Sequence, residues 1–167
     1  MSDDRIEPPL SALRSQADFD QALLWAVDHA ARERSRRLTW LDADFASWPL
    51  DNPALLQALD VWLRLPQRRL VLLALDFAPL QRLHPRFVAW RRPWSHAIDA
   101  WSPSDGVDVH MPTLVLDDQR LCLQVFDKTH WRGRLSQDER AVRQWHDEID
   151  AILQRCEAAF PAHSLGL

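Results

Sequence analysis

The chain has 167 residues, of which 47% are hydrophobic and 26% are charged, a balance typical of a globular protein with one core. Its net charge of −4 argues against a protein that binds nucleic acid with its whole surface, although a local basic face could still bind it. The longest uninterrupted hydrophobic run, residues 70–75, is too short to cross a membrane.

The N-terminal segment lacks the features of an export signal. Residues 1–15 are acidic and contain proline, without a basic start or a hydrophobic stretch. We interpret them as a flexible tail and residues 16–167 as one domain. Cys122 and Cys156, in a predicted strand and a predicted helix, lack metal-type spacing, so we expect reduced structural thiols. These features together predict a cytoplasmic protein without a membrane span.

The first half of the chain alternates between helical and strand patterns. Hydrophobic residues at helical spacing predict a helix within residues 17–37, and the β-prone run 37–42 predicts a strand. Asn52 and Pro53 supply an N-cap and a first-turn proline for a second helix. The continuous hydrophobic run 69–75 predicts a central strand covered on both faces.

The second half continues this alternation and ends in a helix. Residues 78–94 predict a helix interrupted at Pro85, and residues 96–101 a short strand. Residues 113–126 read as a hairpin that turns at 117–120. The last helix begins at a capping box of Ser136 and Glu139. Its side chains expected to bury are Val142, Trp145, Ile149 and Ile152. The predicted fold is a single-domain α/β fold, with a mixed sheet of about five strands, an antiparallel hairpin and helices packed on it.

Carboxylates follow the two central strands, where ligands bind in open α/β sheets. Asp42 and Asp44 resemble the D-x-D motif of haloacid dehalogenase-like phosphatases. Such enzymes need a hydroxyl residue after the next strand, where Asp76 stands, and the only lysine, Lys128, comes late in the chain. We therefore interpret these aspartates as solvated, turn-forming residues.

Other common sites are missing from the sequence. Three glycines are too few for a glycine-rich phosphate loop, and the seven histidines form no metal-binding pattern, so we expect no metal and no cofactor.

His110 and Asp117 have the outer spacing of the H-x-K-x-x-x-x-D motif that marks the phospholipase D-like superfamily. In that superfamily the histidine attacks phosphorus and the lysine holds phosphate oxygens. The order of elements before the pair, and the hairpin after it, also resemble one phospholipase D half. Pro112 occupies the lysine position, however, and the chain contains one motif where an active site uses two. We therefore favour a structural role for His110 and Asp117, which remain weak catalytic candidates.

The segments RLTWLDADFASWPLDNPALLQAL and RRLVLLALDFAPLQRLHPRF, with the closing LGL, resemble an uncharacterised bacterial domain with a degenerate phospholipase D-like fold. That domain also occurs attached to N-acetyltransferase domains, which this sequence lacks. The resemblance covers about residues 16–167 and implies one phospholipase D-like half.

An arginine-rich segment, residues 82–94, is the second candidate site. Its anion-binding candidates are Arg82, His84, Arg86, Arg91 and Arg92. Trp90 or Trp94 could stack on a base. The alternative, which we favour, is an amphipathic helix with solvated arginines and buried tryptophans.

Three functions remain open. The leading one is a non-catalytic phospholipase D-like domain that binds an anionic ligand, RNA or a protein partner. The second is a phosphodiesterase or nuclease completed by homodimerisation. The third is a purely structural interaction module. The missing lysine argues against the second.

Overall fold

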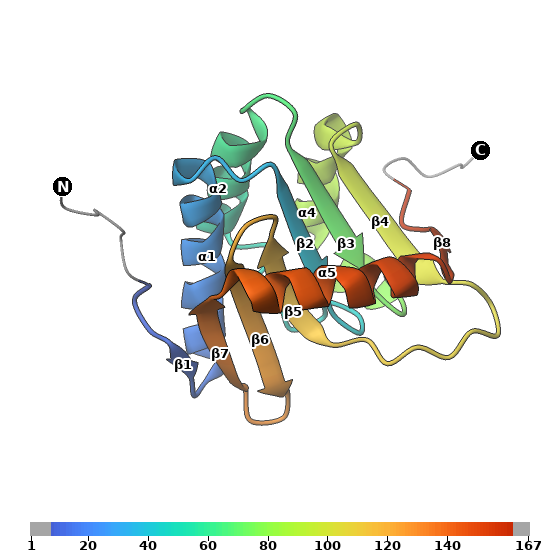
Figure 1. The fold of residues 1–167 in the computed structure, drawn as a ribbon. Coiled ribbons are helices and arrows are strands. Elements are labelled where there is room, and N and C mark those ends of the chain that lie inside the picture. The colour runs from blue at the N-terminus through green and yellow to red at the C-terminus, as the bar shows by residue number, and fades with distance from the viewer. Residues whose placement is uncertain (1–7, 162–167) are drawn as a thin grey trace.

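The hydrophobic runs form the middle of an eight-stranded mixed sheet, in a computed structural model that describes residues 8–161 (Figure 1). The strand order is β1-β7-β6-β5-β2-β3-β4-β8. Strands β2, β3 and β4 run parallel, and every other neighbouring pair is antiparallel. The strands are β1 (Ala12–Leu13), β2 (Arg37–Leu41), β3 (Arg69–Leu73), β4 (Ile98–Pro103), β5 (Thr113–Asp117), β6 (Leu121–Asp127), β7 (Arg132–Gln137) and β8 (Cys156–Ala158).

The mixed α/β fold and the β5–β6 hairpin are confirmed, but the predicted number of strands is wrong, because β1, β7 and β8 were not expected. Strand β7 is mostly polar, and Leu135 is its only buried hydrophobic residue, so it lacks the pattern that marks a strand. Close pairing holds it in the sheet: a side chain at Gly133 would overlap the Gln124 carbonyl of β6.

The structure describes only part of the predicted N-terminal tail and none of the closing LGL. Residues 12–13, within the predicted tail, form β1 and pair with β7. Residues 1–7 of that tail and the closing residues 165–167 lie outside residues 8–161.

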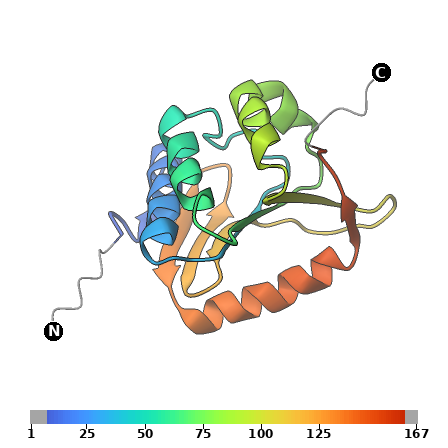
Figure 2. The same cartoon turned by 90° about the horizontal axis from the view of Figure 1, so that it is seen from above.

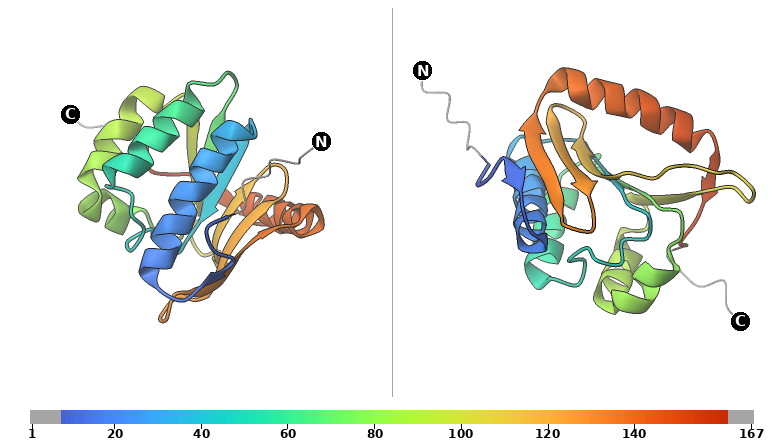
Figure 3. Two further views of the ribbon diagram at one scale, coloured as in Figure 1. Left: turned by 90° about the vertical axis from the view of Figure 1, so that its left-hand side faces the viewer. Right: turned by 90° about the horizontal axis from the view of Figure 1, so that it is seen from below.

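Helices cover both faces of the sheet (Figure 2). Those on one face are α1 (Gln16–Arg32), α2 (Pro53–Leu63), α3 (Ala78–Leu83) and α4 (Pro85–Arg91), followed by the short 3-10 helix η1 (Arg92–Trp94). The other face is crossed by α5 (Glu139–Leu153), which Figure 3 shows on the side opposite α1 and α2. The break at Pro85 and the Asn52 cap are confirmed, the Asn52 side chain accepting from the Ala54 N–H at 2.9 Å. None of the described helices is long and apolar enough to cross a membrane.

Alternation along the central strands separates the core into two layers. Leu38 and Trp40 of β2 and Val115 of β5 pack in the larger layer beneath α1 and α2. Leu41 and Leu114 pack in the smaller layer beneath α5. Because successive side chains of a strand point to opposite faces of the sheet, each layer of helices packs on its own apolar surface.

The last helix begins later than predicted. Its N-cap is Asp138, whose carboxylate accepts from the Arg140 N–H at 3.0 Å. Ser136 is part of β7 and pairs with Cys122 of β6. Ile149 is buried as expected, but Trp145 and Ile152 are half-buried. Ser136 does not cap the helix, because it belongs to strand β7 and is paired with β6.

The two cysteines are free thiols in separate strands. Cys122 lies buried in β6, and Cys156 lies in β8 rather than in the predicted helix. Burial raises the pKa of the Cys122 thiol to about 11, so this group is protonated at neutral pH.

Candidate functional site

A cleft of about 620 Å³ opens where β2 ends, β5 begins and β6 ends, with α5 as one wall. Its polar lining residues are Asp44, His110, Thr113, Gln124, Lys128 and Glu148. Its apolar lining residues are Ala43, Met111, Pro112, Val125, Phe126, Trp145 and Ile152. The position agrees with the rule that open α/β sheets bind ligands beyond the carboxyl ends of their parallel strands.

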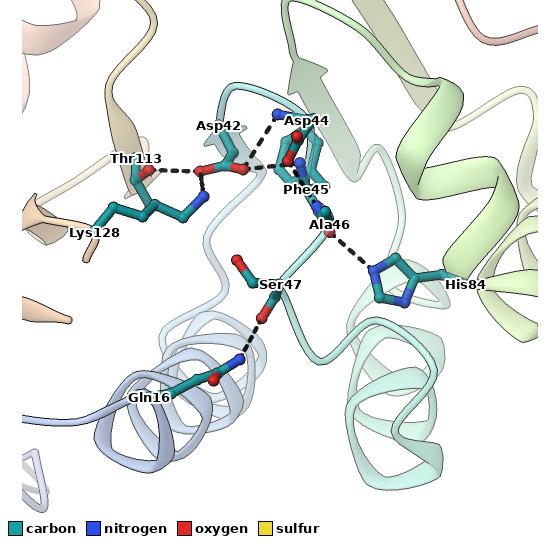
Figure 4. A network of polar contacts seen from close by, with 9 residues as sticks. All are labelled: Gln16, Asp42, Asp44, Phe45, Ala46, Ser47, His84, Thr113 and Lys128. Carbon is teal, nitrogen blue, oxygen red and sulfur yellow. Dashed lines mark hydrogen bonds and ion pairs between the residues drawn. The ribbon is translucent and has the colours of Figure 1, made fainter. Parts of the chain in front are cut away.

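A fully buried carboxylate, Asp42, lies at the base of this region, directly after β2 (Figure 4). Its Oδ1 accepts from Thr113 Oγ1 and from Lys128 Nζ, each at 2.5 Å. Its Oδ2 accepts from the backbone N–H of Phe45 at 2.8 Å and of Asp44 at 3.3 Å. Four donors therefore compensate the burial of one negative charge.

Lys128 brings the partner charge from the turn that follows β6. Its ammonium binds the buried Asp42, and its side chain is 35% exposed and lines the cleft. The ammonium has three N–H donors, and Asp42 occupies one of them. The turn itself is held by Asp127, which accepts from His130 through its backbone N–H at 3.2 Å and its ring Nδ1 at 2.8 Å.

The loop after Asp42 is held from both sides (Figure 4). Phe45 is buried with φ at 58°, in the left-handed region that bulky residues rarely adopt. Its N–H is bound by Asp42, and its carbonyl accepts from His84 Nε2 at 2.9 Å. Gln16 of α1 donates to the Ser47 carbonyl at 2.9 Å. These contacts fix the backbone that carries Asp44 into the cleft.

His110 and Asp117 do not share the cleft. His110 is exposed and lines the cleft just before β5 begins. Asp117 is the last residue of β5, so it lies at the other end of this strand, away from the cleft. The Asp117 carboxylate accepts from the N–H groups of Gln119 at 2.9 Å and Leu121 at 2.8 Å, and from Ser35 Oγ at 3.3 Å. It therefore holds the β5–β6 turn. Burial raises its pKa, against the lowering effect of these hydrogen bonds.

The arginine segment divides into inward and outward residues. Arg82, Arg86 and Arg92 are exposed. His84 is buried, with its ring on the Phe45 carbonyl. Arg91 is also buried: its guanidinium donates to the Phe160 carbonyl and lies 4.2 Å from the centre of that ring. Burial lowers the pKa of Arg91 to about 10, against the raising effect of Asp99.

Both tryptophans of this segment are half-buried and anchored to α2. The indole N–H groups of Trp90 and Trp94 donate to Asp60 Oδ1, at 2.8 and 3.0 Å. The interpretation of the segment as a packed helical surface accounts for these tryptophans.

Sequence reasoning missed the pairing of Asp42 with Lys128, which lie 86 positions apart. The interpretation of Asp42 as solvated is wrong: it does form a turn, but it is buried, because Lys128 and Thr113 satisfy it. One signal was present. Lys128 is the only lysine among twenty basic residues, the others being arginine. The lysine ammonium is more compact than the planar guanidinium of arginine, so it is better suited to contact a single buried oxygen.

Pro112 occupies the lysine position of the motif, and Lys128, from a different element, lines the same cleft as His110. The cleft is not basic, however, because Asp42 balances Lys128 and the carboxylates of Asp44 and Glu148 lie in the lining. Among residues 8–161, no three His, Cys, Asp or Glu side chains gather as a metal site.

No family model matches this chain, and no curated protein is significantly similar to it in sequence. Two solved structures share its fold. TrmBL2, an archaeal chromatin protein described with a novel mode of DNA binding, is 12% identical with a TM-score of 0.58. Phosphatidylserine synthase from Haemophilus influenzae Rd KW20, a phospholipase D-superfamily member, is 14% identical with a TM-score of 0.54.

The similar region covers nearly all of this chain but only part of each neighbour. It spans 93% of this chain and 56% of the TrmBL2 chain, and 90% of this chain and 39% of the synthase. At such low identity the comparison concerns the fold alone. The protein therefore has a mixed α/β fold that is also found, as a part of longer chains, in a DNA-binding chromatin protein and in a lipid-synthesising enzyme.

Proposed function

We propose that this chain is a phospholipase D-like half that binds a small molecule with one anionic group, without catalysing a reaction. The observation that carries the proposal is the position of Lys128, whose ammonium is fixed by Asp42 at the cleft wall and keeps two N–H donors for a ligand. His110 lines the same cleft and offers ring nitrogens. The fold shared with phosphatidylserine synthase supports the phospholipase D-like assignment.

The lining favours a small ligand over a polymer of phosphates. Asp44 and Glu148 would repel a second and third negative charge but can accept from hydroxyl or amino groups. Phe126 and Trp145 offer apolar and aromatic surface for the rest of the molecule. A cleft of about 620 Å³ is within the usual size of small-molecule sites. A phosphate or carboxylate joined to an organic body meets these requirements.

Binding can be tested by thermal unfolding with AMP, glycerol 3-phosphate and inorganic phosphate. A ligand at one hundred times its dissociation constant stabilises the native state by about 2.7 kcal/mol, a rise of roughly 5–10 °C in a chain of this size. We expect His110→Ala to reduce the rise, because His110 lines the cleft; the variant should still fold, because His110 is exposed. His96→Ala, at another exposed histidine outside the cleft, is the matched control.

Shifts below one degree with every probe would contradict the proposal and favour the interaction module. An equal loss in His96→Ala would also contradict it, since the effect would then be unrelated to the cleft.

A phosphodiesterase completed by dimerisation is the second candidate, favoured by the shared cleft of His110 and Lys128. We expect no turnover of bis(p-nitrophenyl) phosphate, because Asp42 holds the lysine and His110 is the one histidine of residues 8–161 that lines the cleft. Turnover that rises with the square of protein concentration and disappears in His110→Ala would establish the enzyme instead.

A further inference from the structure

Seven arginines gather in two connections of the chain that the cleft does not use. Residues 32–37, R-E-R-S-R-R, run from the end of α1 to the start of β2, and residues 64–69, R-L-P-Q-R-R, run from the end of α2 to the start of β3. Together they contain seven arginines and one glutamate, in a chain whose net charge is −4. Six of these arginines are exposed and Arg68 is half-buried. We call residues 32–37 and 64–69 the arginine edge.

The two connections lie side by side. Strands β2 and β3 begin there in register, with Arg37 opposite Arg69, and the Arg69 N–H donates to the Arg36 carbonyl at 3.0 Å. A hollow of about 320 Å³ opens between the connections. Its lining residues are Arg34, Arg36, Leu65, Pro66, Gln67 and Arg68. Three arginines from two segments therefore line one hollow.

Little negative charge balances these groups. Arg69 pairs with Asp99 at 2.7 Å, and the Asp118 carboxylate accepts from the Arg36 backbone N–H at 3.3 Å. Within residues 8–161, the side chains of Arg34 and Arg36 form no ion pair and no hydrogen bond with one another or with other residues. Arg68 donates to the Pro66 carbonyl at 2.7 Å, which orients its guanidinium without neutralising it. Like charges held together in this way favour an anion between them.

The arginine edge and the cleft lie at opposite ends of the sheet. Figure 1 shows the α1–β2 and α2–β3 connections together at the top, where the parallel strands begin, whereas the cleft forms where β2 ends. A ligand at one end therefore leaves the other end free.

We infer that the arginine edge binds the phosphate backbone of double-stranded nucleic acid without reading its sequence. The guanidinium group of arginine can donate two parallel hydrogen bonds to the oxygens of a phosphate. A single phosphate in the hollow would leave the other arginines of the edge without a ligand, whereas a nucleic acid backbone offers them further phosphates. Single strands are usually bound with aromatic side chains that stack on the bases. Among the residues that the structure describes, no aromatic side chain lines this hollow, so contacts to a duplex backbone fit it better.

Arg34 allows a variant that separates binding from folding. It follows the end of α1 with φ at 56°, in the left-handed region where glycine is favoured. The next residue, Ser35, donates to the Ala30 carbonyl at 2.9 Å, which closes the helix. Arg34→Gly therefore removes a charge while relieving the backbone, so it should not lower the melting temperature.

The test is fluorescence anisotropy of the full chain with a labelled 20-base-pair DNA duplex, at salt concentrations from 50 to 200 mM. The slope of log affinity against log salt is negative, and each lost phosphate contact makes it less steep by about 0.9. We expect Arg34→Gly with Arg36→Gln to weaken binding at least tenfold at 50 mM salt and to make the slope less steep by about 2. Its melting temperature should stay at or above that of the parent.

The matched control is Arg132→Gln with Arg134→Gln, which removes two exposed arginines from β7. We expect its affinity to remain within twofold of the parent. Equal weakening in both double variants, or no binding of the duplex at 50 mM salt, would overturn the inference. Stronger binding of inorganic tripolyphosphate than of the duplex, at equal phosphate concentration, would overturn it too.

Discussion

Asp42 and Lys128 show how a single ion pair can decide both stability and the character of a site. Removing Lys128 leaves a fully buried carboxylate without its charge partner, which is strongly destabilising in deep interiors and less so here, where Lys128 is 35% exposed. We expect Lys128→Met to cost about 2 kcal/mol, or roughly 4–8 °C in melting temperature.

The neutral pair Asp42→Asn with Lys128→Met completes a double-mutant cycle, to be measured by chemical denaturation. It should be more stable than Lys128→Met alone, because the buried charge has gone. Additive losses would mean that the two side chains do not interact in solution.

His29 gives the fold a dependence on acid. It is buried on α1, stacked on Trp25 with ring centres 4.6 Å apart. Desolvation lowers the pKa of His29 below 6.5, against the raising effect of Glu33 and Asp117. The unfolded chain therefore binds a proton before the native chain does, and stability that is present above pH 6.5 is lost as the pH falls through the lowered pKa.

Denaturation midpoints at pH 8, 6.5 and 5 should show this loss in the parent and a flatter profile in His29→Gln. The Asp117 carboxyl, whose pKa is raised, acts with the opposite sign, since it stabilises the native state below pH 3.8 and loses this effect as the pH rises through the raised pKa. A parallel profile in the variant would assign the acid sensitivity to other groups.

At the scale of elements, α5 is joined to the sheet by few buried side chains. Val142 and Ile149 are its buried residues, over the layer that contains Leu41 and Leu114. Ile149→Ala should cost about 2–5 kcal/mol in chemical denaturation, the range for emptying a core position. Gln144→Ala, at an exposed position of the same helix, should have little effect. A loss below half a kilocalorie for Ile149→Ala would mean that α5 leaves the sheet readily.

The exposed arginines of α3 and α4 are the remaining anion-binding prediction. Arg82 and Arg86 point to solvent on either side of the inward-facing His84. If they bind RNA or phosphate, thermal stabilisation by these ligands should fall with salt and disappear in Arg82→Glu with Arg86→Glu. A shift that survives in this variant but disappears in Arg34→Gly with Arg36→Gln would assign the binding to the arginine edge.

The elements that could be predicted were those whose signal is local. The run in β3 and the Asn52–Pro53 start of α2 carry their own pattern or cap, and the β5–β6 turn carries its own turn residues. Strand β7 approaches β6 closely at Gly133, and β8 pairs with β4 beside the contact of Arg91 with the Phe160 carbonyl. Such pairings depend on distant parts of the chain, so no window of sequence contains them.

At the scale of the whole molecule, the sequence indicated where to look but not that a site is there. The rule for parallel strands drew attention to Asp42 and Asp44, which we interpreted as turn residues, and the cleft lies beside them. His110 belongs to it, whereas Asp117 does not. Lys128 reaches it only because β6 pairs with β5, which brings the turn after β6 beside the start of β5.

Both outer strands of the sheet come from the two ends of the described chain. Strand β1 has two residues and β8 has three, and each pairs along one side only, with β7 and β4. Short outer strands offer few free backbone donors and acceptors to another molecule. Trimming either end would bare the longer strands β7 or β4, and their unpaired backbone would invite strand addition between copies. We therefore expect variants that lack β1 or β8 to aggregate more readily than the parent.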